Sequence, residues 1–222
     1  MRLRGLYAIT AGAPRLLERV AAVIAGGAAV VQYRDKSADN AHREREARDV
    51  LAVCRAHGVP LIINDDVALA ATVGAHGGRS RHPASRDTYT SLCGVHLGRD
   101  DAAVREAQRV LGDAAIIGVS CYNDFDRAVA AQQAGASYVA FGRFFASHTK
   151  PDAVPASLDL IRQAKAQLSI PAVAIGGITP DNAAPLIDAG VDMLAVVHGI
   201  FGQSDPEQAA RRYTQLFEQL KE

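Results

Sequence analysis

Eight short apolar runs, each followed by a longer amphipathic segment, constrain the fold of this chain more than any other feature. The runs are rich in Val, Ile and Ala and are apolar at consecutive positions, which is typical of parallel strands that are buried on both faces. They occupy residues 5–10, 28–33, 59–64, 93–98, 114–120, 137–142, 171–176 and 192–197.

The segments between the runs carry helix signals. Helices are expected at residues 38–57, 101–111, 124–134, 156–168, 180–189 and 206–220. Asp205 is the expected N-cap of the last one, and Thr179 the expected N-cap of the one before it. Eight strand–helix units in 222 residues predict a (β/α)8 TIM barrel that forms a single domain, residues 1–222. A doubly wound open sheet is the alternative, but the chain has no G-x-G-x-x-G turn.

One segment interrupts the repeat. Residues 78–93 are polar and basic and separate the third helix from a fourth strand expected to begin at Gly94. We predict a loop insertion on the N-terminal face of the barrel, away from the chemistry. It would be a mobile surface loop or an oligomer contact, so a homo-oligomer is possible.

Charge and cysteine content narrow the class of protein. The formal net charge is zero, which gives no support for a nucleic-acid or membrane partner. No apolar run is long enough to span a bilayer, and polar residues interrupt the apolar N-terminus as they would not in a signal peptide. The three cysteines, Cys54, Cys93 and Cys121, are too far apart for a zinc motif and odd in number. We expect buried thiols in a reducing cytoplasm.

Polar side chains follow almost every run. Because active groups of a barrel come from the C-terminal ends of its strands, these residues are the candidate site. They are Gln32, Arg34, Asp35, Lys36, Asn64, Asp65, Asp66, Asp100, Asp101, Ser120, Cys121, Tyr122, Asn123, Arg143, Ser147, His148, Thr149, Lys150 and His198. The seventh run instead ends in two glycines, Gly176 and Gly177, whose exposed N–H groups suit a phosphate.

The charges of this ring indicate anionic ligands. Arg34, Lys36 and Lys150 supply cations, and Asp65 and Asp101 supply hard oxygen ligands that suit Mg2+ shared with phosphate oxygens. The ring therefore suggests one metal-bound polyphosphate and one monophosphate. As the alternative, Asp101 and Asp66 could cap helices and Asp65 could pair with an arginine.

Three further expectations concern single side chains. His96 lies within the fourth run and is expected to be a packed core histidine, whereas His198 lies at a strand end and could contact a ligand. Gln32, Arg34 and Lys36 are spaced by two, so they share one face for as long as the strand persists. Tyr33 and Asp35 would then point the other way, and Asp35 would be an orienting or structural partner instead of a metal ligand.

The strand-end motifs resemble one known family. "GLYAIT", "VVQYRDKS", "LIINDD", "GVHLGRDD", "YVAFGRFFASHTKP" and "VAIGGIT" are similar, in order, to motifs of the thiamine-phosphate synthases, in a form typical of proteobacteria. The resemblance covers nearly the whole chain apart from 78–93. It implies a transferase of thiamine biosynthesis that joins 4-amino-2-methyl-5-hydroxymethylpyrimidine diphosphate to 4-methyl-5-(2-phosphoethyl)thiazole and releases diphosphate.

The resemblance also implies residue roles. Catalytic groups would be Arg34, Lys36, Ser120 and Lys150, and Mg2+ would bind to Asp65 and Asp101. Substrates would contact Gln32, Tyr33, Arg34, Asp35, Lys36, Asn64, Ser120, Ser147, His148, Thr149, Lys150, Gly177, Val197 and His198. The diphosphate would leave from a pyrimidine methyl cation that the thiazole nitrogen attacks, with no protein nucleophile.

The sequence departs from the family pattern at a few positions, among them Ala11, Tyr122 and His198. These bear on the shape of the thiazole pocket. The rival readings are a thiazole tautomerase, which would need no diphosphate ligands and would carry a histidine at Tyr122, and a barrel that only binds a phosphorylated ligand.

Overall fold

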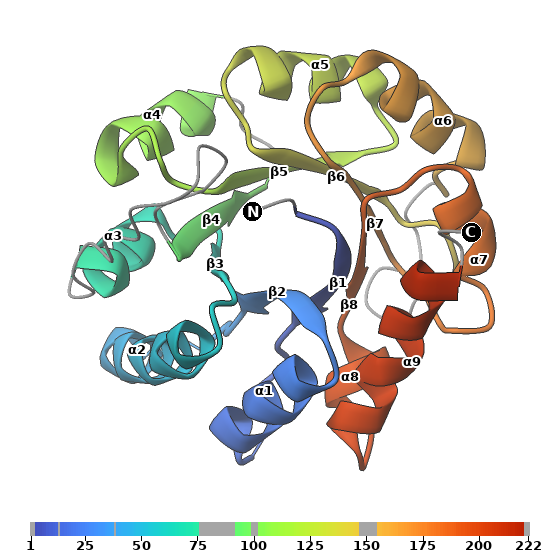
Figure 1. Ribbon diagram of the computed structural model, residues 1–222. Helices are drawn as coiled ribbons and strands as arrows, with labels where there is room; N and C mark the ends of the chain where they lie inside the picture. Colours follow the sequence, from blue (N-terminus) through green and yellow to red (C-terminus); the bar gives the residue numbers. More distant parts are fainter. Residues whose placement is uncertain are drawn as a thin grey trace.

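Eight parallel strands close into a barrel, in chain order, with the helices arranged around the outside (Figure 1). The computed structural model describes residues 3–12, 14–37, 39–75, 92–98, 102–146 and 155–219. The strands are β1 (Gly5–Ile9), β2 (Ala28–Tyr33), β3 (Leu61–Asn64), β4 (Cys93–Leu97), β5 (Ile117–Tyr122), β6 (Tyr138–Gly142), β7 (Ala172–Ile175) and β8 (Met193–Val196). The predicted (β/α)8 barrel is confirmed, and the open-sheet alternative is excluded by the pairing of β1 with β8.

The helices follow the strands as expected. They are α1 (Leu16–Ala25), α2 (Asn40–Ala56), α3 (Val67–Ala75), α4 (Ala102–Leu111), α5 (Phe125–Gln133), α6 (Leu158–Gln167), α7 (Ala184–Asp188), α8 (His198–Phe201) and α9 (Pro206–Gln219). The predicted insertion lies outside the described residues except at its end, where β4 begins at Cys93, one residue before the expected Gly94.

The starts of α7 and α9 can be compared with the helix starts predicted from the sequence. Asp205 accepts a hydrogen bond from the backbone N–H of Gln208 (3.0 Å), so it caps α9 as predicted. The prediction for α7 was wrong, because that helix begins at Ala184 and not at residue 180. The backbone N–H of Thr179 donates to the side chain of Asn182 (2.8 Å), which closes a turn and delays the helix.

Apolar side chains form two cores, because neighbouring residues of a strand point to opposite faces of the sheet. One core fills the barrel, and the other packs between the strands and the surrounding helices. On β1, for example, Tyr7 points into the barrel and Leu6 toward the helices. This alternation decides which strand-end side chains can reach the mouth of the barrel.

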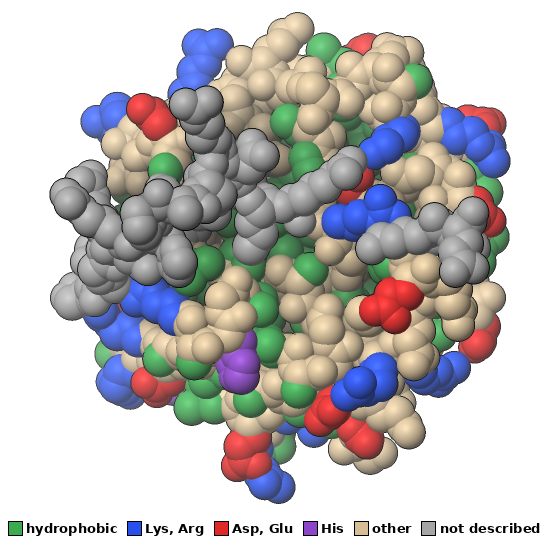
Figure 2. All heavy atoms as spheres, in the orientation of Figure 1, with side chains coloured by type: hydrophobic (Ala, Val, Ile, Leu, Met, Phe, Trp, Pro, Cys, Tyr) green, Lys and Arg blue, Asp and Glu red, His purple; other side chains and the backbone are tan. Residues whose placement is uncertain are grey.

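The surface shows no single dominant charge. On the face in Figure 2, acidic and basic side chains of the described residues are interspersed, in keeping with the zero net charge. No helix in the described part of the chain is long and apolar enough to cross a bilayer. The three cysteines are free and buried, as expected.

Candidate active site

The end of β2 supplies the first group of candidate ligands. The Gln32 side chain points into the barrel, where its Nε2 donates to the Tyr7 hydroxyl (2.7 Å). The Tyr33 side chain points outward, and its hydroxyl donates to Glu46 on α2 (2.9 Å). The predicted alternation is therefore confirmed for these two residues. It does not extend further, because the strand ends at Tyr33.

Arg34 and Asp35 lie just beyond that end. The backbone N–H of Arg34 donates to Thr10 Oγ1 (2.9 Å), which ties this loop to the end of β1. The Asp35 carboxylate accepts from the backbone N–H (2.9 Å) and the hydroxyl (2.6 Å) of Ser37. Burial opposes ionisation of Asp35, but these hydrogen bonds keep its pKa below the usual value. Asp35 therefore shapes the loop that carries Arg34 and the exposed Lys36, as expected of a structural partner.

Two adjacent aspartates after β3 have different surroundings. Asp66 caps α3, accepting from the backbone N–H of Leu69 (2.8 Å), and its other oxygen pairs with Arg43 (2.9 Å). Asp65 is exposed, and its carboxylate accepts from Asn64 Nδ2 (2.7 Å). The cap proposed for Asp66 is confirmed, and among the described residues the arginine pairs with Asp66 instead of Asp65.

The backbone at Asp65 is unusual in a way that suits a site. Its φ is 60°, a left-handed conformation that is uncommon outside glycine and that clusters at functional positions. Its N–H donates to the carbonyl of His96 at the end of β4 (2.8 Å). The loop is thus anchored to the next strand, and the carboxylate is held at the mouth of the barrel, where a hard cation could use it.

Ser120 connects the mouth to the barrel interior. Its hydroxyl lies 2.9 Å from His96 Nε2, and His96 Nδ1 lies 3.0 Å from the hydroxyl of Tyr138. Burial lowers the pKa of His96 to about 4, against a smaller opposing effect of Asp65, so the ring is neutral near pH 7. His96 is therefore a core histidine, as expected, and it contacts Ser120, a candidate substrate-binding residue.

The ends of β7 and β8 form the candidate phosphate site. Gly177 has a φ of 65°, and a Cβ there would lie 2.3 Å from the carbonyl oxygen of Ala146, so only glycine fits. Val197 is half-buried and His198 is exposed. His198 lies directly after β8, where the short helix α8 begins.

Several predicted ligands lie outside the described residues. They are Asp101, Ser147, His148, Thr149 and Lys150. Their places in the site remain predictions, and so does the pairing of Asp65 with Asp101 around Mg2+.

Ligand-type atoms come together at one other place in the described part of the chain. Oxygen and nitrogen atoms of Asp35, His42 and Glu46 lie within 4.8 Å of one another. The Asp35 oxygens already accept from Ser37, and Glu46 accepts from Tyr33. These groups therefore have structural partners and do not replace Asp65 as the candidate metal ligand.

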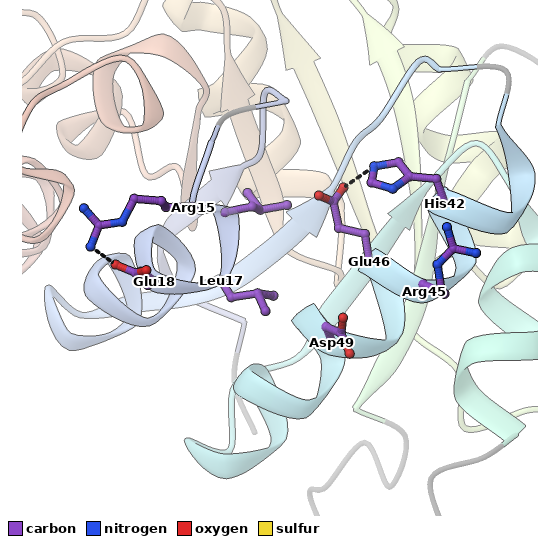
Figure 3. A pocket seen from close by; sticks show the side chains of 8 residues that line it. Arg15, Leu17, Glu18, His42, Arg45, Glu46 and Asp49 are labelled. Carbon is purple, nitrogen blue, oxygen red and sulfur yellow. Dashed lines mark hydrogen bonds and ion pairs between the residues drawn. The ribbon is translucent and has the colours of Figure 1, made fainter.

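A groove beside this cluster runs between α1 and α2 (Figure 3). Its lining includes the ion pairs Arg15–Glu18 and His42–Glu46. Opposite charges thus pair within the groove wall, on helices outside the barrel. None of the strand-end candidate residues is among the described residues that line this groove.

Sequence reasoning missed two tyrosines that contact the candidate site. Tyr7 and Tyr138 are fully buried, and their hydroxyls lie 2.7 Å apart inside the barrel. In the sequence they are parts of apolar runs. Their place on the inward face of their strands, next to the strand-end ligands, was the available signal.

Comparisons with known proteins show the family of this chain. The family model described as thiamine monophosphate synthase matches residues 6–86 and 88–200. A thiamine-phosphate synthase of Thioalkalivibrio sulfidiphilus is 51% identical over 98% of this chain and 97% of its own length. A thiamine-phosphate synthase of Thiobacillus denitrificans is 50% identical over 96% and 94%.

Two solved structures have the same fold as this chain. A thiamine phosphate pyrophosphorylase from Pyrococcus furiosus superimposes with a TM-score of 0.80 at 28% identity. The superposition covers 100% of this chain and 98% of the pyrophosphorylase chain. A 3-hexulose-6-phosphate synthase at 16% identity and a TM-score of 0.65 shares the fold. The chain therefore belongs to the thiamine monophosphate synthase family of transferase enzymes.

Proposed function

We propose that this enzyme joins 4-amino-2-methyl-5-hydroxymethylpyrimidine diphosphate to 4-methyl-5-(2-phosphoethyl)thiazole, giving thiamine phosphate and diphosphate. The observation that carries the proposal is the set of polar groups at one end of the barrel. Gln32 on β2 and Ser120 on β5 join one interior hydrogen-bond network through Tyr7 and His96, and the backbone of Asp65, just after β3, is bonded to the His96 carbonyl.

The pyrimidine diphosphate is proposed to bind beside β2, β3 and β5. Gln32, Asn64 and Ser120 offer neutral hydrogen-bond donors, while Arg34 and Lys36, together with Lys150, supply positive charge. Tyr33 contributes through its strand position, since its hydroxyl is directed to Glu46. Cations placed at a leaving diphosphate stabilise the charge that develops as the bond to carbon breaks.

Mg2+ is the proposed cofactor. Asp65 fits this role because its carboxylate is exposed and its backbone is fixed to β4, and Asp101 is proposed as the second ligand. A bound Mg2+ would neutralise charge on the diphosphate oxygens. The chain's own part is to hold the two carboxylates and the cations around the same leaving group.

The thiazole phosphate is proposed to bind at the ends of β6, β7 and β8. Gly177 lets the backbone approach a phosphate closely, as its crowded, left-handed position supports. Val197 and His198 would line the same pocket, with Ser147, His148 and Thr149 completing it. His198 begins α8, directly after β8.

The proposed reaction needs no protein nucleophile. The carbon–oxygen bond to diphosphate breaks first, which leaves a pyrimidine methyl cation stabilised by the ring amino group. The thiazole nitrogen then gives its electron pair to that carbon. The enzyme contributes charge stabilisation of the leaving group and placement of the two substrates.

The direct test is product formation. We expect the purified protein to make thiamine phosphate from both substrates with Mg2+ and to make none with EDTA. Asp65→Asn should lose most activity at saturating substrates, whereas Asp113→Asn, an exposed aspartate in the loop before β5, should keep it. No thiamine phosphate from the wild-type protein with Mg2+ present would refute the proposal.

Three broader statements accompany it. We propose that residues 1–222 form one domain, that 78–93 is a loop insertion, and that the enzyme works in the cytoplasm. The three free, buried thiols support a reducing compartment.

A further inference from the structure

Five polar side chains form a continuous hydrogen-bonded chain inside the barrel. The chain begins at Gln32 Nε2, which lies 2.7 Å from the Tyr7 hydroxyl, and Tyr7 lies 2.7 Å from the hydroxyl of Tyr138. Tyr138 then lies 3.0 Å from His96 Nδ1, and His96 Nε2 lies 2.9 Å from Ser120 Oγ. Both ends of the chain are candidate ligands of the pyrimidine diphosphate.

The packing of Tyr7 and Tyr138 does not require their hydroxyl groups. Tyr7 and Tyr138 are 1% and 0% exposed, and their rings meet edge to face at 5.8 Å. Phenylalanine would fill the same space. Burying a hydroxyl is costly unless it is hydrogen-bonded. Two buried hydroxyls that packing does not require therefore point to a role in positioning Gln32 and Ser120, the residues at the two ends of the hydrogen-bonded series.

The order of donors and acceptors along the chain follows from its first member. An amide nitrogen can only donate, so of the two hydrogen-bond partners of the Tyr7 hydroxyl, Gln32 Nε2 and the Tyr138 oxygen, only the Tyr138 oxygen can accept the Tyr7 proton. A buried hydroxyl needs such an acceptor, which directs the Tyr7 proton to Tyr138. The Tyr138 proton then goes to His96 Nδ1. Burial raises the pKa of both tyrosines, so each hydroxyl keeps its proton near neutral pH.

This order fixes the histidine and the serine. A neutral imidazole that accepts at Nδ1 carries its proton on Nε2. His96 Nε2–H therefore donates to Ser120 Oγ, and the hydroxyl proton of Ser120 is left for a partner at the mouth of the barrel. We infer that Tyr138 and His96 are positioning residues that make Ser120 a hydrogen-bond donor to the diphosphate of the substrate.

The first test reads the tautomer of His96 directly. In long-range 1H–15N spectra of histidine-labelled protein, with the His96 signal assigned by its loss in His96→Gln, we expect the proton on Nε2 at pH 7. A proton on Nδ1 would mean that the chain runs in the opposite direction, from Ser120 toward Gln32, and would overturn the inference. This measurement needs no turnover, so it stands or falls separately from the proposed function on which the role of Ser120 rests.

The second test asks whether Tyr138 acts through Ser120. Tyr138→Phe should lower kcat/KM for the pyrimidine diphosphate roughly tenfold, the worth of one hydrogen bond to the ligand, and leave KM for the thiazole phosphate unchanged. In a Ser120→Ala background the same substitution should have no further effect. An equal loss in both backgrounds would show that Tyr138 acts independently and would overturn the inference.

Tyr213→Phe is the matched control. Tyr213 is also a buried tyrosine with one hydrogen bond, from its hydroxyl to the Ile178 carbonyl (3.1 Å), but it lies on α9, outside the barrel. It should change kcat/KM for the pyrimidine diphosphate less than threefold. A tenfold loss in this variant would assign the effect to the general loss of a buried hydroxyl, against the inference.

Discussion

Replacing Gly118 with alanine tests the packing that supports the interior chain. Gly118 on β5 pairs with His96 on β4 and with Tyr138 on β6. The His96 and Tyr138 rings stack across it, with centroids 5.7 Å apart and planes at 21°. They can do so because the residue between them has no side chain.

The magnitude follows from the space available. A Cβ on Gly118 would lie 2.0 Å from Cζ and 2.3 Å from the hydroxyl oxygen of Tyr138, whereas carbon atoms pack at about 3.5–4.0 Å. The tyrosine ring must move by about 1.5 Å. Overpacking of this kind costs about 1–3 kcal/mol, and loss of the hydrogen bond from Tyr138 to His96 adds about 1 kcal/mol. We expect the free energy of unfolding to fall by about 2–4 kcal/mol, or Tm by about 5–15 °C.

Thermal and urea unfolding of Gly118→Ala beside Gly74→Ala would measure this. Gly74 lies in α3, and a Cβ there would meet the Cβ of Cys93 at 3.6 Å, an ordinary contact. The same substitution should therefore raise stability by about 0.5–1 kcal/mol, as alanine does in helices. An unchanged Tm in Gly118→Ala would show that the Tyr138 ring does not cover this position and would refute the reasoning.

Three further outcomes are expected. Asp66→Ala should lower the free energy of unfolding by about 1–2 kcal/mol in urea because α3 loses its cap, whereas Asp65→Asn should change it by less than about 0.5 kcal/mol; equal effects would contradict the assignment of the two roles. Asp192→Ala should cost about 1–3 kcal/mol by the same assay, because the buried carboxylate accepts from the backbone N–H of Ala172 (3.0 Å), and an unchanged midpoint would argue against that contact. Burial raises the pKa of Cys54 to about 12 and that of Cys93 to about 11, so these two thiols should react with a disulfide reagent at pH 8 only after unfolding, and rapid reaction in the native state would contradict their burial.

The sequence predicted the strands well because parallel strands that are buried on both faces consist of consecutive apolar residues. It placed Gln32 inward and Tyr33 outward correctly, since alternation is a local property. It offered an arginine partner for Asp65, whereas Arg43 pairs with Asp66, because this contact depends on where α2 lies relative to the end of β3. Nor could it place α7, where the side chain of Asn182 competes with a helix start at the preceding proline.

The hydrogen-bonded side chains inside the barrel show more clearly what the sequence cannot predict. Tyr7 and Tyr138 are 131 residues apart along the chain, yet their hydroxyls are in contact. Closure of the barrel brings β1 and β6 to a common interior, and no local pattern specifies which inward side chains then meet. His96 could be identified as a core residue from its run, but its partners follow only from the three-dimensional register.

The gap left by Gly118 has a consequence for how this barrel can be altered. Any larger residue at this position displaces a ring on the neighbouring strand, and shrinking that ring first would leave His96 without its stacking partner. Enlarging position 118 alone, or removing the ring at position 138 alone, is thus unfavourable, and a larger residue at 118 needs a smaller one at 138 to keep the interior filled. A mutagenesis library aimed at new substrates should vary positions 96, 118 and 138 together or leave all three unchanged.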